Sequence, residues 1–127
     1  MAIKLVIADD APFIREVIKQ IAITHEMKVV GEASNGVEAV QLARSTQPDV
    51  IVMDLVMPDK NGIEAIREIL DNQPQIKIIA CSTMTNETIL IRALKAGACD
   101  VVIKPFTQEK LLTAIKKATG YIQEPNP

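Results

Sequence analysis

The segment IKLVIADDAP, residues 3–12, joins an apolar run to a pair of acids and then to a proline. Residues 3–8 are almost all apolar and rich in β-branched side chains, as expected of a strand that is covered on both faces. Asp9 and Asp10 end this run, and Pro12 falls in the first turn of a helical pattern, where its missing N–H is tolerated. The segment therefore predicts a buried strand followed directly by a helix.

The same order of a short apolar strand and a helical pattern recurs along the chain. Further strands are predicted at residues 28–33, 49–53, 76–81 and 101–103. The helices are predicted from Pro12 onward and at about residues 36–45, 63–70, 86–96 and 108–118. Strands that alternate with helices form a parallel sheet with helices on both faces. We predict an α/β fold, a doubly wound, flavodoxin-like (βα)5 unit with strand order 2-1-3-4-5.

Length and composition limit the organisation of the chain and its partners. The 127 residues fit one domain, which we assign to residues 1–120, followed by a short C-terminal tail at residues 121–127. A formal net charge of -2 and 2% aromatic residues argue against direct nucleic-acid binding. No apolar run is long enough to cross a bilayer, so we expect a cytoplasmic protein with no membrane contact. The two cysteines are too few for a disulfide framework.

Polar residues follow the predicted strands at the point where each strand ends. Asp9 and Asp10 come after the first strand, and Asp54 comes after the third. Ser82 follows the fourth strand and Lys104 follows the fifth. Because the carboxyl ends of parallel strands meet at one edge of a sheet, we expect these side chains to converge. Neighbouring strands lie roughly 4.8 Å apart, so the acids after the first and third strands can share a ligand.

Crowded carboxylates without histidine or cysteine favour a hard divalent cation. Mg²⁺ fits such a site, and Mn²⁺ can substitute for it. We expect Asp10 and Asp54 to bind the metal directly and Asp9 to act largely through water. Asp54 is then the nucleophile toward a phosphoryl group, a reaction that depends on positioning and electrostatic stabilisation. Lys104 and Ser82 would each contact a phosphoryl oxygen.

Each of these residues also has an ordinary structural explanation. Asp10 could cap the first helix, and Asp54 could be a loop acid. Ser82 could satisfy a turn, and Lys104 could be a solvated surface charge. The shared position of all of them after strands at one edge favours a functional site.

Several segments match one known family at its usual spacing: LVIADDAP, DLVMPDKNG from Asp54 to Gly62, Ser82, KAGACD, and Lys104-Pro105-Phe106. Over almost its whole length the sequence resembles the bacterial response-regulator receiver domain, in particular single-domain receivers of the chemotaxis kind. The resemblance implies that Asp54 accepts a phosphoryl group from a sensor histidine kinase or a histidine phosphotransfer protein. It also implies Mg²⁺ dependence and a metal contact from the backbone carbonyl of Val56. A cis bond before Pro105 is implied as well, which would aim Lys104 into the site, so Pro105 is counted among the modulating residues.

The sequence departs from the family pattern at positions that modulate switching. Val101 stands where the family usually has an aromatic residue that rotates on activation. Val56 and Met84 flank the expected phosphoryl group, and neither side chain can orient an attacking water. We therefore expect slow self-dephosphorylation and a signal that is carried by a backbone or helix shift.

The resemblance further implies an output surface on the fourth helix, fifth strand and fifth helix, which binds a downstream protein target. The predicted fourth helix has apolar residues on more than one face, namely Ile89, Leu90, Ile91 and Leu94. Wider contact with the core and a docking or dimer surface are both consistent with this pattern. Monomer and weak homodimer both stay open, as do chemotaxis and phosphorelay pathways.

Three other functions stay open as alternatives. An aspartyl-phosphate phosphohydrolase usually has an acid two residues after its nucleophile, where this chain has Val56. A flavin carrier would have Asp9 and Asp10 repelling the flavin phosphate. A receiver-like interaction module that is never phosphorylated is the third. We expect no enzyme activity beyond the chain's own phosphorylation and slow dephosphorylation.

Overall fold

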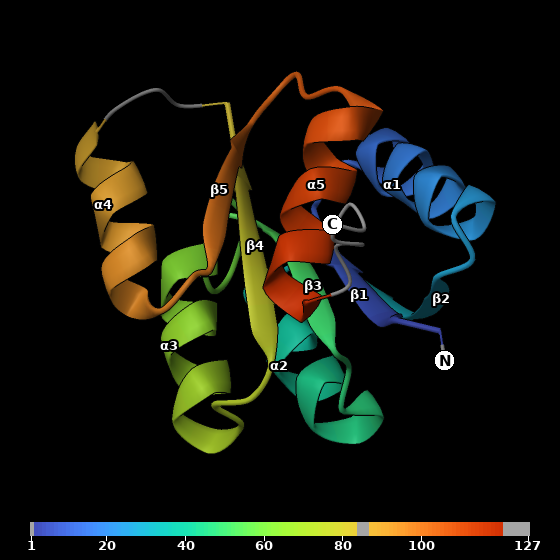
Figure 1. Ribbon diagram of the computed structural model, residues 1–127. Helices are drawn as coiled ribbons and strands as arrows, with labels where there is room; N and C mark the ends of the chain where they lie inside the picture. Colours follow the sequence, from blue (N-terminus) through green and yellow to red (C-terminus); the bar gives the residue numbers. More distant parts are fainter. Residues whose placement is uncertain (1, 84–86, 121–127) are drawn as a thin grey trace.

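The computed structural model describes residues 2–83 and 87–120 (Figure 1). The predicted tail at residues 121–127 and the modulating residue Met84 lie outside them. The elements in chain order are β1 (Lys4–Ala8), α1 (Pro12–Thr24), β2 (Lys28–Ala33), α2 (Gly36–Thr46), β3 (Val50–Asp54), α3 (Gly62–Asn72), β4 (Lys77–Ser82), α4 (Glu87–Ala96), β5 (Asp100–Ile103) and α5 (Gln108–Thr119).

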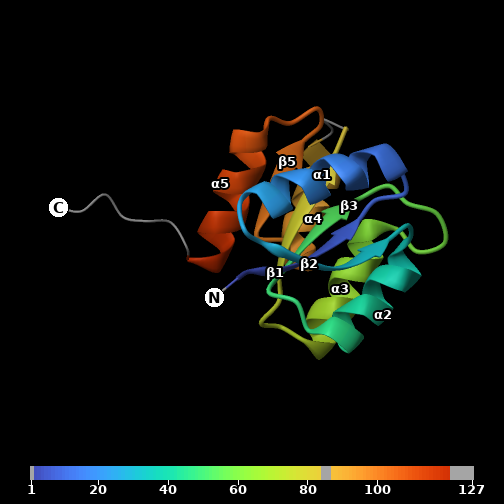
Figure 2. The same cartoon turned by 90° about the vertical axis from the view of Figure 1, so that its right-hand side faces the viewer.

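The five strands form one parallel sheet in the order β2-β1-β3-β4-β5. Helices α1 and α5 cover one face, and α2, α3 and α4 cover the other (Figures 1 and 2). The fold predicted from the alternation of strands and helices is therefore confirmed. Among the described residues, no helix is long and apolar enough to cross a membrane.

The sheet separates two hydrophobic cores, because successive side chains of a strand point to opposite faces. In β1, Val6 and Ala8 join the core under α2, α3 and α4. Leu5 and Ile7 join the core under α1 and α5. The central strand β3 is buried along its whole length, which holds its last residue firmly at the carboxyl edge of the sheet.

Strands β3 and β4 each run one residue further than the sequence indicated. Asp54 is the last residue of β3 and Ser82 is the last residue of β4, whereas both were expected just after their strands. The ladder continues because the N–H of Leu55 donates to the carbonyl of Cys81 at 3.0 Å, and the N–H of Lys104 donates to the carbonyl of Ser82 at 2.8 Å. Both side chains are therefore held by sheet backbone instead of loop backbone.

Two asparagines begin the helices that follow β2 and β3. The side chain of Asn35 accepts a hydrogen bond from the N–H of Glu38 at 2.8 Å. Asn61 accepts one from the N–H of Glu64 at 2.9 Å. Such N-caps satisfy backbone donors that a helix leaves free, and they fix where α2 and α3 start.

The backbone N–H of the glycine after each of these asparagines forms a hydrogen bond that holds the loop between β3 and α3 in place. The N–H of Gly36 donates to the carbonyl of Lys60 at 3.0 Å, and the N–H of Gly62 donates to the carbonyl of Leu55 at 3.0 Å. Both glycines are buried in close contact with backbone. The loop after Asp54 is therefore anchored both to the start of α2 and to the start of α3.

We predict that Gly62→Ala lowers the free energy of unfolding by about 2 kcal/mol, because overpacking against rigid atoms displaces backbone. A Cβ at Gly62 would lie 2.3 Å from the carbonyl oxygen of Asp54 and 2.7 Å from the Cα of Leu55. Gly31→Ala is the control, since its Cβ would meet only the flexible end of Leu42, at 2.8 Å. Urea unfolding followed by far-UV circular dichroism measures both. Equal losses in the two variants would contradict the prediction.

Candidate functional site

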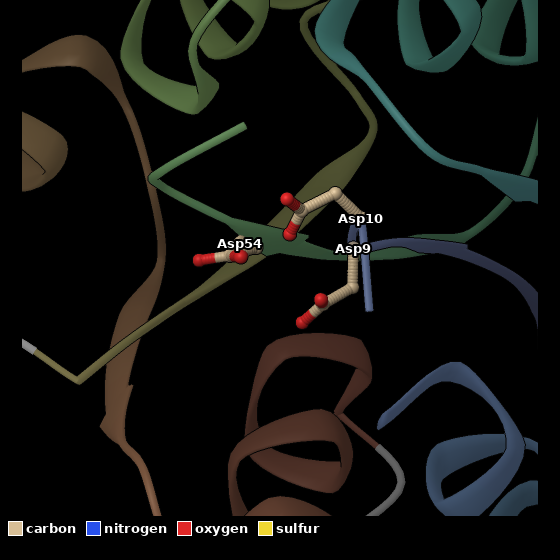
Figure 3. Close-up of side chains that lie close together, drawn as sticks. All are labelled: Asp9, Asp10 and Asp54. Carbon is tan, nitrogen blue, oxygen red and sulfur yellow. The ribbon is translucent and has the colours of Figure 1, made fainter. Parts of the chain in front are cut away.

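Three carboxylates gather at the carboxyl edge of the sheet, where β1 and β3 end. Asp9 and Asp10 follow β1 and Asp54 ends β3, as Figure 3 shows. One oxygen from each of the three lies within 4.8 Å of the others. Asp9 and Asp54 are buried, whereas Asp10 is exposed, so the cluster is reached from solvent on the Asp10 side. The predicted convergence of the acids is therefore present in the structure.

Asp9 is bonded at all of its polar positions. Its N–H donates to the carbonyl of Ala33 at 2.9 Å, which ties the end of β1 to β2. Its Oδ1 accepts from the N–H of Ala11 at 2.9 Å, and its Oδ2 accepts from the Nζ of Lys104 at 2.5 Å. Its carbonyl accepts from the Nη1 of Arg15 at 2.6 Å. The backbone and the carboxylate of Asp9 are therefore both held in one position.

Asp54 is a buried carboxylate whose ionisation is opposed by its surroundings. Burial raises the pKa of its carboxyl above the ordinary value, and the charges of Asp9 and Asp10 act in the same direction. The Lys104 ammonium, with Nζ 3.5 Å from Oδ2, and the N–H of Val56, 3.2 Å from Oδ1, oppose this shift. Asp54 therefore gains from any further positive charge that enters the site.

Lys104 joins two of the carboxylates. Burial lowers the pKa of its ammonium, but the hydrogen bond to Asp9 and the charge of Asp54 outweigh this effect and leave the pKa raised. Its peptide bond to Pro105 is cis, as the family resemblance implied. Ser82 lies at the same edge at the end of β4, fully buried. Lys104 and Ser82 thus flank Asp54 from the side of β4 and β5.

The donor set fits a hard divalent cation. Three carboxylates within 4.8 Å carry more negative charge than the single ammonium of Lys104 can balance. The cluster offers only oxygen ligands, which Mg²⁺ prefers over the nitrogen and sulfur ligands that are typical of zinc sites. Asp9, Asp10 and Asp54 could therefore hold such an ion.

The alternative explanation of Asp10 as a helix cap is wrong. Ala11 is the N-cap of α1, and no side-chain hydrogen bond caps this end. The wider-core explanation of α4 is wrong for two of its residues, since Ile91 and Leu94 are 48% and 49% exposed. Ile89, in contrast, packs against the core under α2, α3 and α4.

Three of the predicted modulating residues, Val56, Val101 and Pro105, lie among the described residues, in different environments. Val56 is 58% exposed beside Asp54, whereas Val101 is half-buried and packs against the core. Pro105 is exposed. Their roles in switching stay predictions.

Arg15 is a contact of the site that sequence reasoning missed. It lies near the start of α1, three residues after Pro12, and reaches back to the carbonyl of Asp9. A single arginine in an amphipathic helix usually lies on the solvated face, so the residue type alone did not indicate a contact with the site. Its position a few residues after the acid pair, at the start of the first helix, was the available hint.

Comparison with known proteins agrees with the family resemblance of the sequence. The family model of the response regulator receiver domain matches residues 5–116 of this chain. The chemotaxis protein CheY of Thermotoga maritima is 42% identical over 119 residues, which cover 94% of this chain and 99% of the relative. CheY of Bacillus subtilis is 42% identical over 117 residues, with 92% and 98% coverage.

A solved structure gives the same result in three dimensions. The response regulator domain of Thermotoga maritima CheB superposes with a TM-score of 0.87 at 37% identity, covering 98% of this chain and all of that domain. The acid cluster, the lysine and the sheet order therefore occur in a chain that matches receivers over nearly its full length. The chain belongs to the response regulator receiver domain family, with CheY-like chemotaxis proteins among its relatives.

Proposed function

We propose that the chain is a phosphoacceptor of two-component signalling, in which Asp54 takes a phosphoryl group from a partner phosphohistidine. The observation that carries this proposal is the joint placement of the three carboxylates within 4.8 Å and of the Lys104 ammonium against two of them. Such a site combines a nucleophile with positive charge close to where the phosphoryl oxygens would lie.

Asp10, Asp54 and the carbonyl of Val56 would bind Mg²⁺ directly, and Asp9 would act through water. Mn²⁺ can replace Mg²⁺ in such a site. When bound, the ion supplies positive charge that offsets the repulsion between the carboxylate and the phosphoryl oxygens. Lys104 supplies a second positive charge, and its contact with Asp54 places its ammonium beside the reacting group. Ser82 offers a hydroxyl donor from the end of β4.

In the transfer step, a carboxylate oxygen of Asp54 bonds to phosphorus while the phosphorus–nitrogen bond of the donor breaks. The electron pair of that bond returns to the imidazole nitrogen. The product is an acyl phosphate on Asp54, and Lys104 then balances its additional negative charge. The chain ends its signal when a water molecule hydrolyses this bond.

We predict that acetyl phosphate with Mg²⁺ adds one phosphoryl group to the wild-type chain and none to Asp54→Asn. The amide keeps the shape of the carboxylate but loses its nucleophilic charge. Intact-protein mass spectrometry under native pH measures the gain. Asp59→Asn is the matched control, because Asp59 is an exposed acid in the same loop with a φ of 67°, which asparagine tolerates. Phosphorylation of Asp54→Asn at the wild-type level would refute the proposal.

The acyl phosphate should be long-lived, because Val56 beside the acceptor is apolar and cannot orient a water molecule. We predict that Val56→Asn shortens its lifetime several-fold, since an amide can hold the attacking water. The decay of phosphorylated protein after removal of acetyl phosphate gives the lifetime. Val37→Asn places the same amide on an exposed valine of α2, 42% exposed, and should leave the lifetime unchanged. An unchanged lifetime in Val56→Asn would contradict this explanation.

An apolar groove between α1 and the loop before α5 offers a docking place for the phosphodonor. It is lined by Phe13, Val17 and Ile21 of α1 and by Phe106, with Gln108 among its polar residues. Phe13 is 76% exposed, which is unusual for so large an apolar side chain unless it marks an interaction site.

The position of this groove suits delivery of a phosphoryl group. Phe13 lies three residues after Asp10, and Phe106 lies two residues after Lys104. A helix of a kinase or phosphotransfer protein seated there would have its histidine close to the acid cluster. The groove thus supports a protein donor, with apolar contacts that a small donor lacks.

We predict that Phe13→Asp slows transfer from a phosphorylated donor protein by at least tenfold, since such anchors contribute about 2 kcal/mol or more. Phosphorylation by acetyl phosphate should stay at the wild-type rate. Ile23→Asp is the matched control, an apolar residue of the same helix that is 53% exposed and does not line the groove. The measurement is transfer of radiolabelled phosphate from a phosphohistidine donor. Equal slowing with acetyl phosphate would show damage to the site instead of loss of docking.

The surface formed by α4, β5 and α5 is the proposed output face toward a downstream protein. Ile91, Leu94 and Ile103 are the large apolar residues exposed there. A groove lined by Val56, Met57, Ile89 and Arg92 lies between the loop after Asp54 and α4. A change at the acceptor loop can therefore reach α4 directly, without an aromatic ring at Val101.

A further inference from the structure

The Arg15 side chain links the first helix to the ends of two strands. Its Nη1 donates to the carbonyl oxygen of Asp9 at 2.6 Å, and its Nε lies 3.4 Å from the Oε1 of Glu32 in β2. The side chain is only 19% exposed. Lys19 approaches the other oxygen of Glu32 at 3.6 Å. The guanidinium therefore has one fixed orientation, set by Glu32 on one side and the β1 backbone on the other.

The carbonyl that Arg15 binds belongs to the peptide unit between Asp9 and Asp10. This peptide determines the direction in which the Asp10 side chain leaves the backbone. Within residues 2–83 and 87–120, no hydrogen bond or ion pair holds the Asp10 carboxylate, which is exposed. Its placement toward Asp54 therefore depends on its backbone, and Arg15 is the side chain that fixes that backbone.

The Arg15 contact also differs in kind from the other side-chain contact of Asp9. Lys104 is shared between Asp9 and Asp54, so its contact with Asp9 changes when charge is added at Asp54. Arg15 contacts a carbonyl, whose charge does not change during the reaction. A guanidinium stays protonated at any working pH and forms a strong, directional bond to a carbonyl. The bond can therefore persist through the whole phosphorylation cycle.

We propose that Arg15 is a positioning residue for the acid pair. By fixing the peptide between Asp9 and Asp10, it holds both carboxylates toward Asp54 and so sets the affinity of the site for its divalent cation. This inference rests on the proposed function, because it concerns the ion that the phosphoacceptor uses. Groups that orient metal ligands from outside the ligand set typically contribute about 10-fold or more to affinity.

The test measures Mn²⁺ binding directly, by electron paramagnetic resonance of the free ion, in the wild-type chain and in Arg15→Gln and Arg15→Lys. We expect Arg15→Gln to bind Mn²⁺ about 10-fold more weakly. Arg15→Lys should be intermediate, because a lysine keeps the charge but not the planar fork. Glu32→Gln, which leaves the bond to Asp9 in place, should change the affinity much less. Far-UV circular dichroism verifies the fold of each variant.

A second readout separates positioning from a general structural defect. With acetyl phosphate, Arg15→Gln should need about 10-fold more Mg²⁺ for half-maximal rate but should reach nearly the wild-type rate at saturation. Wild-type affinity in Arg15→Gln would overturn the inference, as would a saturating rate that falls in proportion to affinity. If Arg15→Gln fails to fold, wild-type affinity in Arg15→Lys would still overturn it. Absence of Mn²⁺ binding in the wild type would instead refute the cation site on which the proposed function depends.

Discussion

The properties of the site depend on like charges that the fold holds close together at the edge of a buried sheet. Three carboxylates have oxygens within 4.8 Å of one another, and they repel strongly because two of them, Asp9 and Asp54, are buried. The core on both faces of β1 and β3 holds them there, so hydrophobic packing maintains an arrangement that electrostatics opposes. Lys104 offsets only part of the repulsion. A site in this condition responds strongly to added cations or anions, which is what a signalling switch requires.

Most of the fold and the site could be predicted from the sequence, because both follow from where apolar runs end. The alternation of strands and helices gave the sheet, and the acids after β1 and the lysine after β5 gave the site's edge. The last residue of each strand was harder to predict from the sequence. Asp54 and Ser82 belong to β3 and β4 because ladder hydrogen bonds continue past the apolar residues, and hydrogen bonds leave no mark on hydrophobic patterning.

The sequence could not show which apolar residues of a helix remain at the surface. In α1, Val17 continues the helical spacing of Ile18 and Ile21, yet it is 36% exposed and lines the groove with Phe13. In α4, Ile89 packs inward while Ile91 does not. These outcomes depend on how far each helix is rotated on the sheet, which is a tertiary property. Arg15 was missed for a related reason, since its partner is a backbone carbonyl and carbonyls are the same at every position.

The two Asn-Gly pairs at the starts of α2 and α3 affect how the protein ages. In open peptides this pair deamidates readily, because the glycine nitrogen attacks the asparagine side chain and forms a cyclic imide. Here the Asn35 and Asn61 side chains accept hydrogen bonds from their helices. The N–H groups of Gly36 and Gly62 donate to the carbonyls of Lys60 and Leu55. Attack requires the glycine nitrogen to lose its proton, and these hydrogen bonds hold that proton in place. The contacts that anchor the loop after Asp54 thereby also protect its Asn61 from spontaneous conversion to an acid, which would add negative charge to a loop that follows a site already crowded with it.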